Sequence, residues 1–202
     1  MRYLFFIFSI IMLTHCFGCA TTVSTDAPRK IANESATTSK SAELPRSQKL
    51  DMDKARQVAN VYRLLDIQKV TQNFNPVILK DIVMRTQFTA AYLSRCDINT
   101  LRALIASGWA PSVIIQTPGG QKHIRVVIGY DHPPERLALV DIENPSNLME
   151  LDEGYGDFRR QWNRKTCVVF DRNVSESMVK SALNKYLPRK KVSSIGVTTR
   201  VK

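Results

Sequence analysis

The stretch that decides the fold runs from Lys122 to Asp131 and reads KHIRVVIGYD. It is rich in β-branched residues and lies between two turn signals, Pro118-Gly119-Gly120 and His132-Pro133-Pro134. Such a run between such turns is typical of a β-strand, which we place at His123–Tyr130.

Similar runs on both sides of this stretch predict an antiparallel sheet. Residues 112–116 and 137–142 form the neighbouring strands of a meander, and residues 166–170 form a fourth strand. Their enrichment in Val and Ile suits a pleated, half-buried surface.

Helical periodicity precedes the sheet. Apolar positions from Leu50 predict a helix that ends near Gln68, and Asn75-Pro76 supplies the start of a second. A third helix runs from about Asn99 to Gly108, which ends it as a left-handed C-cap.

One more helix is expected after the fourth strand. Asn173 and Glu176 have the spacing of a capping box at its start. Its predicted inner stripe consists of Val174, Met178, Ala182, Leu183 and Tyr186. The expected order is helices, sheet and a C-terminal helix, which is an α+β fold.

Two polar residues mark the ends of neighbouring predicted strands. His123 opens its strand, and Asp141 closes the next one within LVDIENP, residues 139–145. A short turn between antiparallel neighbours would place both at one end of the sheet, where the carboxylate can orient the imidazole. That is the base-and-orienter half of a nucleophilic triad, although a histidine at a strand start is often only a hydrogen-bonded surface residue.

The N-terminus predicts export. An apolar run from Leu4 to Leu13 is too short to anchor in a bilayer, and Gly18-Cys19 after it resembles the lipobox of bacterial lipoproteins. The resemblance implies that residues 1–18 are removed and that Cys19 carries lipid. The absence of Asp after Cys19 resembles lipoproteins of the outer membrane that face the periplasm. An ordinary signal peptide or an uncleaved helix is the alternative.

The mature chain divides into a tether and one domain. Residues 19–46 are rich in Thr, Ser, Ala, Lys and Glu, so we expect a lipidated, disordered tether. Residues 47–202 have the size of a single domain, and Arg189-Lys190-Lys191 is expected to lie in a solvated basic tail.

The net charge of the chain indicates which classes of partner it can bind. Removal of residues 1–18 takes away one Arg and no acid, so the formal net charge falls from +11 to +10. For an exported protein this favours membrane headgroups, cell-wall polymers or polysaccharide, and no nucleic acid is expected. Of three histidines His15 is lost with the signal, so we expect no metal site and no cofactor.

Cys96 and Cys167 are the thiols that remain after lipidation and signal removal. They either pair as a disulfide or remain free. Reduced, separate thiols are favoured, because Cys167 lies in the apolar run TCVVF and Cys96 in a connection between helices.

Over about residues 48–170 the chain resembles the bacteriocin-processing cysteine peptidases, also called double-glycine peptidases. The resemblance rests on the helix 101–108, the strand 111–116, the His-led strand ending Gly129-Tyr130-Asp131, the Asp-led segment, and Phe158 with Trp162. It implies a papain-like fold in which N-terminal helices pack on an antiparallel sheet. It also implies that His123 is the general base and that Asp141 holds it.

The nucleophile of that family is missing here. The family has a cysteine followed by glycine at the start of the first long helix, with a glutamine a few residues earlier. This chain has QKLDMDKA at residues 48–55, so Gln48 matches the oxyanion glutamine but no thiol or hydroxyl follows. Cys96 is the remaining candidate nucleophile. Without a nucleophile, covalent catalysis is lost.

We therefore expect an outer-membrane-anchored lipoprotein that is not an enzyme. Its degenerate peptidase-like domain would bind a peptide or a partner protein in the former active-site cleft. One alternative is an active thiol peptidase that uses Cys96, His123 and Asp141. Another is a structural envelope lipoprotein that binds through its basic surface.

Lipidation gives a direct prediction. Cys19→Ala should abolish fatty-acid labelling and association with the outer membrane, because the Cys19 thiol is the acceptor of the lipid. Metabolic labelling with a fatty-acid analogue checks this, with Cys16→Ala as the matched control that keeps its label. Label that persists in Cys19→Ala would contradict the lipobox assignment.

Overall fold

The computed structural model of the chain describes residues 41–65, 70–71, 77, 80, 84–144, 146–162 and 164–200. All of them lie within one compact unit, Ser39–Lys202. The predicted signal, Cys19, most of the tether and most of the predicted helix after Asn75-Pro76 lie outside the described residues. No helix in the described ranges is long and apolar enough to cross a membrane.

The described residues form eight strands and five helices. The strands are β1 (Ser47–Lys49), β2 (Thr89–Ser94), β3 (Ser112–Gln116), β4 (Lys122–Asp131), β5 (Arg136–Asp141), β6 (Met149–Gly154), β7 (Cys167–Asp171) and β8 (Gly196–Arg200). The helices are α1 (Met52–Arg63), α4 (Ile98–Ala106), α5 (Tyr155–Gln161), α6 (Glu176–Tyr186) and α7 (Arg189–Ser194).

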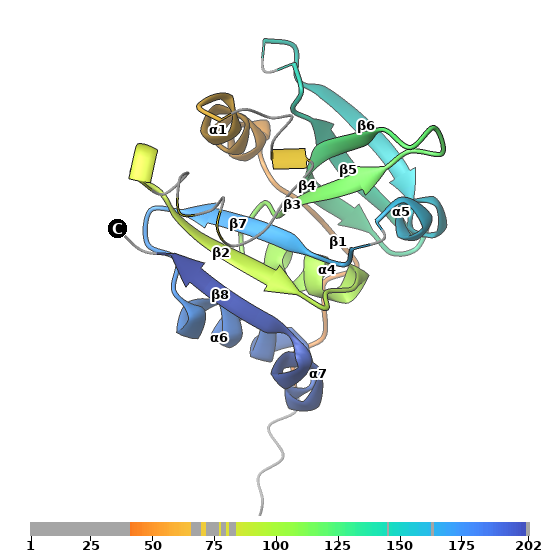
Figure 1. The fold of residues 1–202 in the computed structure, drawn as a ribbon. Coiled ribbons are helices and arrows are strands. Elements are labelled where there is room, and N and C mark those ends of the chain that lie inside the picture. The colour runs from red at the N-terminus through yellow and green to blue at the C-terminus, as the bar shows by residue number, and fades with distance from the viewer. Residues whose placement is uncertain are drawn as a thin grey trace, which may run out of the picture. The chain divides into compact units, whose positions relative to one another are not determined.

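All eight strands belong to one antiparallel sheet, so the α+β class and the predicted meander β3-β4-β5 are confirmed. The strand order is β6-β5-β4-β3-β7-β2-β8, and β1 pairs with β4 outside this path (Figure 1). The predicted order of helices, sheet and helix is wrong, because β2 lies between α1 and α4 in the chain. Its sequence TAAYLS contains small residues and gave no strand signal.

The sheet consists of two sets of strands that meet where β3 pairs with β7. On one side are β4, β5 and β6, and on the other are β2 and β8 (Figure 1). The β3–β7 contact is short, with Ser112 opposite Val168 and Val113 opposite Cys167. We call this contact the seam.

Helices cover both faces of the sheet, because strand side chains alternate between two cores. In β3, Val113 and Ile115 join the core that contains residues of α4 and α6, whereas Ile114 joins the core that contains residues of α1. Cys167 and Val168 of β7 divide in the same way. The buried strands are therefore apolar on both faces, which produces the continuous hydrophobic runs of the sequence.

Two of the predicted helices are present, with small differences at their ends. α1 begins where the Asp51 side chain accepts a hydrogen bond from the Asp53 N–H, and it ends at Arg63 rather than near Gln68. α4 ends as predicted, with Gly108 at a φ of 86°. Glycine adopts this left-handed conformation at little steric cost, because it has no Cβ.

The start of α6 differs from the prediction. The Ser175 hydroxyl, not Asn173, caps the helix by accepting the Met178 N–H at 3.2 Å. Val179 and Leu183 face the core, whereas Met178 is 45% exposed. The place of Met178 in the predicted inner stripe is therefore wrong.

The predicted basic tail is instead folded. Arg189-Lys190-Lys191 forms the first turn of α7, and β8 follows and pairs with β2. Lys191 Nζ lies 2.8 Å from Asp97 Oδ2, and the other oxygen of this carboxylate, Oδ1, caps α4. The C-terminal residues Gly196–Arg200 thus complete the sheet.

A buried hydrogen-bond chain joins α1 to both strands of the seam. The Tyr62 hydroxyl lies 2.7 Å from Ser112 Oγ, and the Ser112 hydroxyl donates to the Val168 carbonyl at 3.1 Å. Tyr62 and Ser112 are both fully buried. Because the Ser112 hydrogen is donated to Val168, the Tyr62 hydroxyl is the donor to Ser112. Burial raises the pKa of the Tyr62 hydroxyl.

This chain yields a stability prediction. Tyr62→Phe should lower the free energy of unfolding by about 1 kcal/mol, and Ser112→Ala by roughly 1 to 3 kcal/mol, because Ser112→Ala leaves the Tyr62 hydroxyl buried without this acceptor. Urea denaturation of both variants and of the double variant measures the coupling. The double variant should cost less than the sum, and simple additivity would contradict the hydrogen-bond chain.

Candidate functional site

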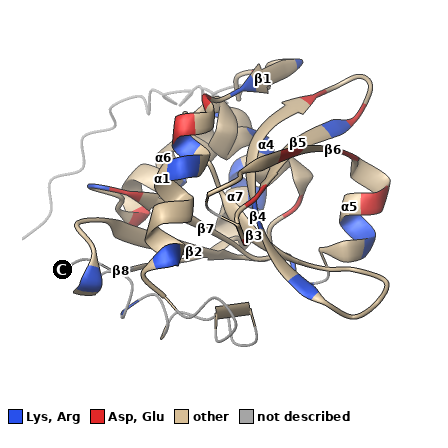
Figure 2. Ribbon diagram, turned by 90° about the horizontal axis from the view of Figure 1, so that it is seen from above, with Lys and Arg blue, Asp and Glu red and all other residues tan. Residues whose placement is uncertain are grey.

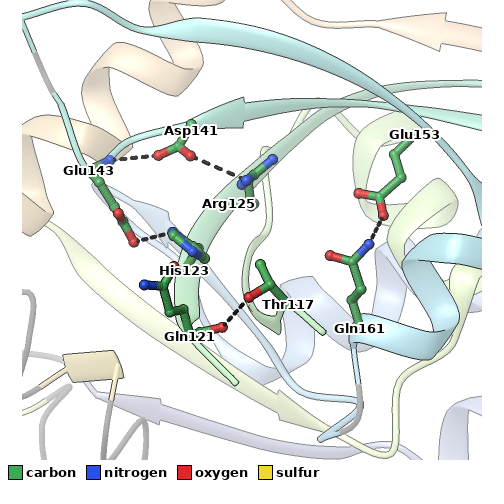
Figure 3. Close-up of polar contacts among 8 residues, drawn as sticks. All are labelled: Thr117, Gln121, His123, Arg125, Asp141, Glu143, Glu153 and Gln161. Carbon is green, nitrogen blue, oxygen red and sulfur yellow. Dashed lines mark hydrogen bonds and ion pairs between the residues drawn. The ribbon is translucent and has the colours of Figure 1, made fainter. Parts of the chain in front are cut away.

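A cluster of paired charges lies on one face of β4, β5 and β6 (Figure 3). His123 Nδ1 lies 2.8 Å from Glu143 Oε1, and the two side chains are 21% and 38% exposed. The register of β4 and β5 explains the pair: Arg125 is opposite Asp141, so His123 is opposite the residue two positions further, Glu143.

Asp141 does not hold His123, contrary to the sequence prediction. Its Oδ2 lies 3.3 Å from Arg125 Nη2, and its Oδ1 accepts the Glu143 N–H at 3.0 Å. In the β4–β5 register, Asp141 is directly opposite Arg125. His123 and Asp141 are therefore diagonal neighbours, a relation that separates residues by about 7 to 8 Å.

Glu153 extends the cluster to β6. The Gln161 side chain of α5 donates to Glu153 Oε1 at 2.6 Å. Burial raises the pKa of the Glu153 carboxyl, Arg125 opposes this shift, and Asp157 adds to it. Beside Gln161, a shallow groove of about 420 Å³ runs between the β3–β4 turn and α5, and the ion pair of Asp157 with Arg160 lies along it.

In this cluster His123 could act as a base and Glu143 orients it, but among the described residues no nucleophile lies beside them for the base to activate. In the ranges that the structure describes, no thiol or hydroxyl forms a hydrogen bond with His123. The carboxylates of Glu143 and Asp141 are occupied by His123 and Arg125. The arrangement suits charge pairing on a sheet face, not nucleophilic catalysis.

Gln48 is far from His123, so its predicted role as an oxyanion remnant is wrong. It lies in β1 opposite Tyr130, at the other end of β4. Seven residues of strand separate Tyr130 from His123, which corresponds to roughly 23 Å.

Gly129 has a packing role in this region. An added Cβ there would come within 3.0 Å of the Gln48 carbonyl oxygen, so glycine allows β1 to approach β4. The Gly129-Tyr130-Asp131 motif is thereby explained by strand packing.

Cys96 is not beside His123 either. Its sulfur lies 3.8 Å from the Cys167 sulfur, and both residues are buried and free of a disulfide. Cys96 follows β2, which β7 and β3 separate from β4, so roughly 14 Å of sheet lies between them. The geometry excludes Cys96 as the partner of His123, and it also shows that the two thiols are adjacent rather than separate.

A second site lies near the Phe170 end of β7, where Trp109 borders a pocket of about 370 Å³. The end of α4 positions this residue: after the left-handed Gly108, the Trp109 N–H donates to the Leu104 carbonyl at 3.1 Å. The Trp109 indole N–H donates to Asp171 Oδ2 at 3.1 Å. Trp109 is thus held by two hydrogen bonds, one from its backbone N–H and one from its indole N–H.

The pocket combines aromatic, aliphatic and polar groups from α1, the α4–β3 connection and the end of β7. Phe170 is held edge-on against Tyr62, with ring centroids 5.4 Å apart. The remaining lining is Lys54, Gln57, Val58, Val61, Gln87, Phe88, Gly108, Ala110, Asp171 and Arg172. Its volume lies within the range of sites for a small ligand or a peptide side chain, and its lining is more polar than that of most such sites.

Sequence reasoning missed Glu143 and Trp109. Glu143 is two residues beyond Asp141 on the same face, and the strand register that pairs Asp141 with Arg125 has no local sequence signal. Trp109 directly follows the helix-ending Gly108, and a large aromatic residue at such a turn is a usable signal for a partly buried anchor.

Comparison with known proteins assigns no family. No protein-family model matches the chain, and no curated protein or solved structure matches it significantly. Within the described ranges no three His, Cys, Asp or Glu side chains gather as for a metal ion.

The raised pKa of Glu153 gives a pH prediction. When the pKa of a carboxyl is higher in the folded than in the unfolded state, the free energy of unfolding falls as pH rises through these two pKa values. Glu153→Gln should therefore stabilise the protein at neutral pH, and its advantage should vanish as pH falls below the ordinary carboxyl pKa of 4.5. Melting temperatures of both proteins across pH check this, and a Glu153→Gln protein that is less stable at neutral pH would contradict it.

Proposed function

We propose that this chain is a lipid-anchored envelope protein that binds a peptide segment of a partner and does not hydrolyse it. The observation that carries binding is the pocket bordered by Trp109, because its aromatic walls are fixed before any ligand arrives. A site that is ordered in advance loses less entropy on binding.

The pocket fits one anchoring side chain of a peptide. Trp109, Phe88 and Phe170 offer apolar contact, and Gln57 and Gln87 are exposed amides that can pair with peptide N–H and C=O groups. Aromatic residues in a pocket dominate many protein interfaces. The sequence favoured binding near His123. We place binding at the Trp109 pocket instead, because the polar side chains around His123 are already paired with one another.

The absence of catalysis is supported by the position of each candidate. His123 contacts Glu143, Cys96 contacts Cys167, and Gln48 lies at the far end of β4. The thiol-peptidase alternative requires Cys96, His123 and Asp141 to converge, and Asp141 contacts Arg125. For the same reason, the proposal does not depend on a papain-like fold or on descent from double-glycine peptidases.

The basic-surface alternative finds less support. Lys and Arg alternate with Asp and Glu around the described elements, and α1 and α5 each carry both signs (Figure 2). Several of these charges form ion pairs, among them Lys49 with Glu150 and Arg136 with Asp152. The lipid on Cys19 remains the proposed contact with the outer membrane.

A peptide-binding experiment tests this function. The purified lipidated protein in detergent is panned against a phage-displayed random peptide library, and the affinity of a selected peptide is then measured by calorimetry. Trp109→Ala should weaken binding by roughly 30-fold, the effect of losing about 2 kcal/mol at an interface hot spot. Lys54→Glu, an exposed change on the pocket wall, should alter the affinity without touching the core.

His123→Ala is the matched control, since it alters the other site and should leave the affinity within about twofold. Equal weakening by His123→Ala would place binding at the charge cluster and contradict the proposal. So would cleavage of the selected peptide that Cys96→Ala abolishes.

A further inference from the structure

Cys96 and Cys167 form a buried pair of thiols that the proposed function does not use. Their sulfurs are 3.8 Å apart although the residues are 71 positions apart in the chain. Their exposed fractions are 1% and 0%.

Backbone hydrogen bonds on both sides fix this proximity. Cys167 is opposite Leu93 in the β2–β7 ladder, and the Cys96 N–H donates to the Lys165 carbonyl at 2.9 Å. Asp97, the next residue, caps α4. A disulfide needs sulfurs about 2.05 Å apart, so the sulfurs must approach by less than about 2 Å, which side-chain rotation can supply.

The two thiols differ in their access. A cavity of about 230 Å³ is lined by Cys96, Asp97, Ile98, Arg159, Trp162 and Lys165, and Cys167 is not among them. The hydrogen bond with Cys96 and burial raise the pKa of the Cys167 thiol, so Cys167 holds its proton longer.

We infer that Cys96 and Cys167 are joined by a disulfide in the exported protein, with Cys96 as the sulfur that reacts first. This modification rests on the export part of the proposed function, because only an oxidising compartment keeps such a bond. The structure has both thiols free, as the sequence predicts, and the inference concerns their oxidation after export.

The reaction is thiol–disulfide exchange with a small disulfide such as oxidised glutathione. The Cys96 thiolate attacks one glutathione sulfur, the glutathione disulfide breaks, and a glutathione thiolate leaves. The Cys167 thiolate then attacks the Cys96 sulfur of the mixed disulfide and releases the second glutathione thiolate. The two leaving thiolates take up the protons of the two cysteines, so one protein dithiol is oxidised and one disulfide is reduced to two thiols.

The bond would close a long loop and restrict the unfolded chain. For a loop of this length in a domain of this size, the melting temperature should rise by roughly 10 °C. It would also attach the connection before α4 covalently to β7, next to the seam.

Peptide mapping tests the inference. Cells that make the full protein are treated with N-ethylmaleimide before lysis, and the unreduced protein is digested with trypsin. A linked pair of peptides, residues 96–102 with residues 166–172, is expected. Alkylated Cys96 and Cys167 in the envelope fraction would overturn the inference.

Stability supplies the second measurement. The purified protein should lose its two thiols in a glutathione redox buffer and gain the rise in melting temperature, and a reductant should reverse both. Cys96→Ser and Cys167→Ser should each lack the reductant-sensitive shift. An unchanged melting temperature after reduction overturns the inference. Peptide binding is read separately, so weak binding by a disulfide-bonded protein contradicts the proposed function alone.

Discussion

The rest of the structure depends on the short pairing between β3 and β7. Two register pairs connect the strand set β4-β5-β6 to the set β2-β8, and the buried Tyr62–Ser112–Val168 hydrogen bonds join α1 to the same point. Buried polar groups of this kind cost free energy unless each finds its partner. The seam is therefore specific, because a shift of register would leave Ser112 and Tyr62 without these partners.

The aromatic pocket is a consequence of the seam. Phe170 extends β7 beyond the seam and packs against Tyr62, while Trp109 reaches the same place from the end of α4. Cys167 is itself a seam residue, but its side chain joins Cys96 in the core on the other face of the sheet from Phe170. The same two strands thus carry residues of the proposed binding site and of the proposed covalent link.

Much of the fold could be predicted from the sequence because periodicity and turn residues are local signals. The strands β3, β4, β5 and β7 and the helix α4 follow from apolar runs, prolines and glycines. The small, mixed sequence of β2 and the acidic one of β6 have no such signal, because pairing partners make them strands. The site was harder: the strand register pairs Asp141 with Arg125, so His123 contacts Glu143, two residues beyond Asp141.

The most direct test of the account is a nitrogen-15 NMR spectrum of the protein with and without a selected peptide. The chain has two tryptophans, so the two indole N–H signals are easily assigned by substitution. Binding in the pocket bordered by Trp109 predicts that the Trp109 indole signal shifts. The signal of Trp162, which is buried against Phe158, should stay in place. A peptide that shifts the His123 ring signals and leaves Trp109 unchanged would contradict it.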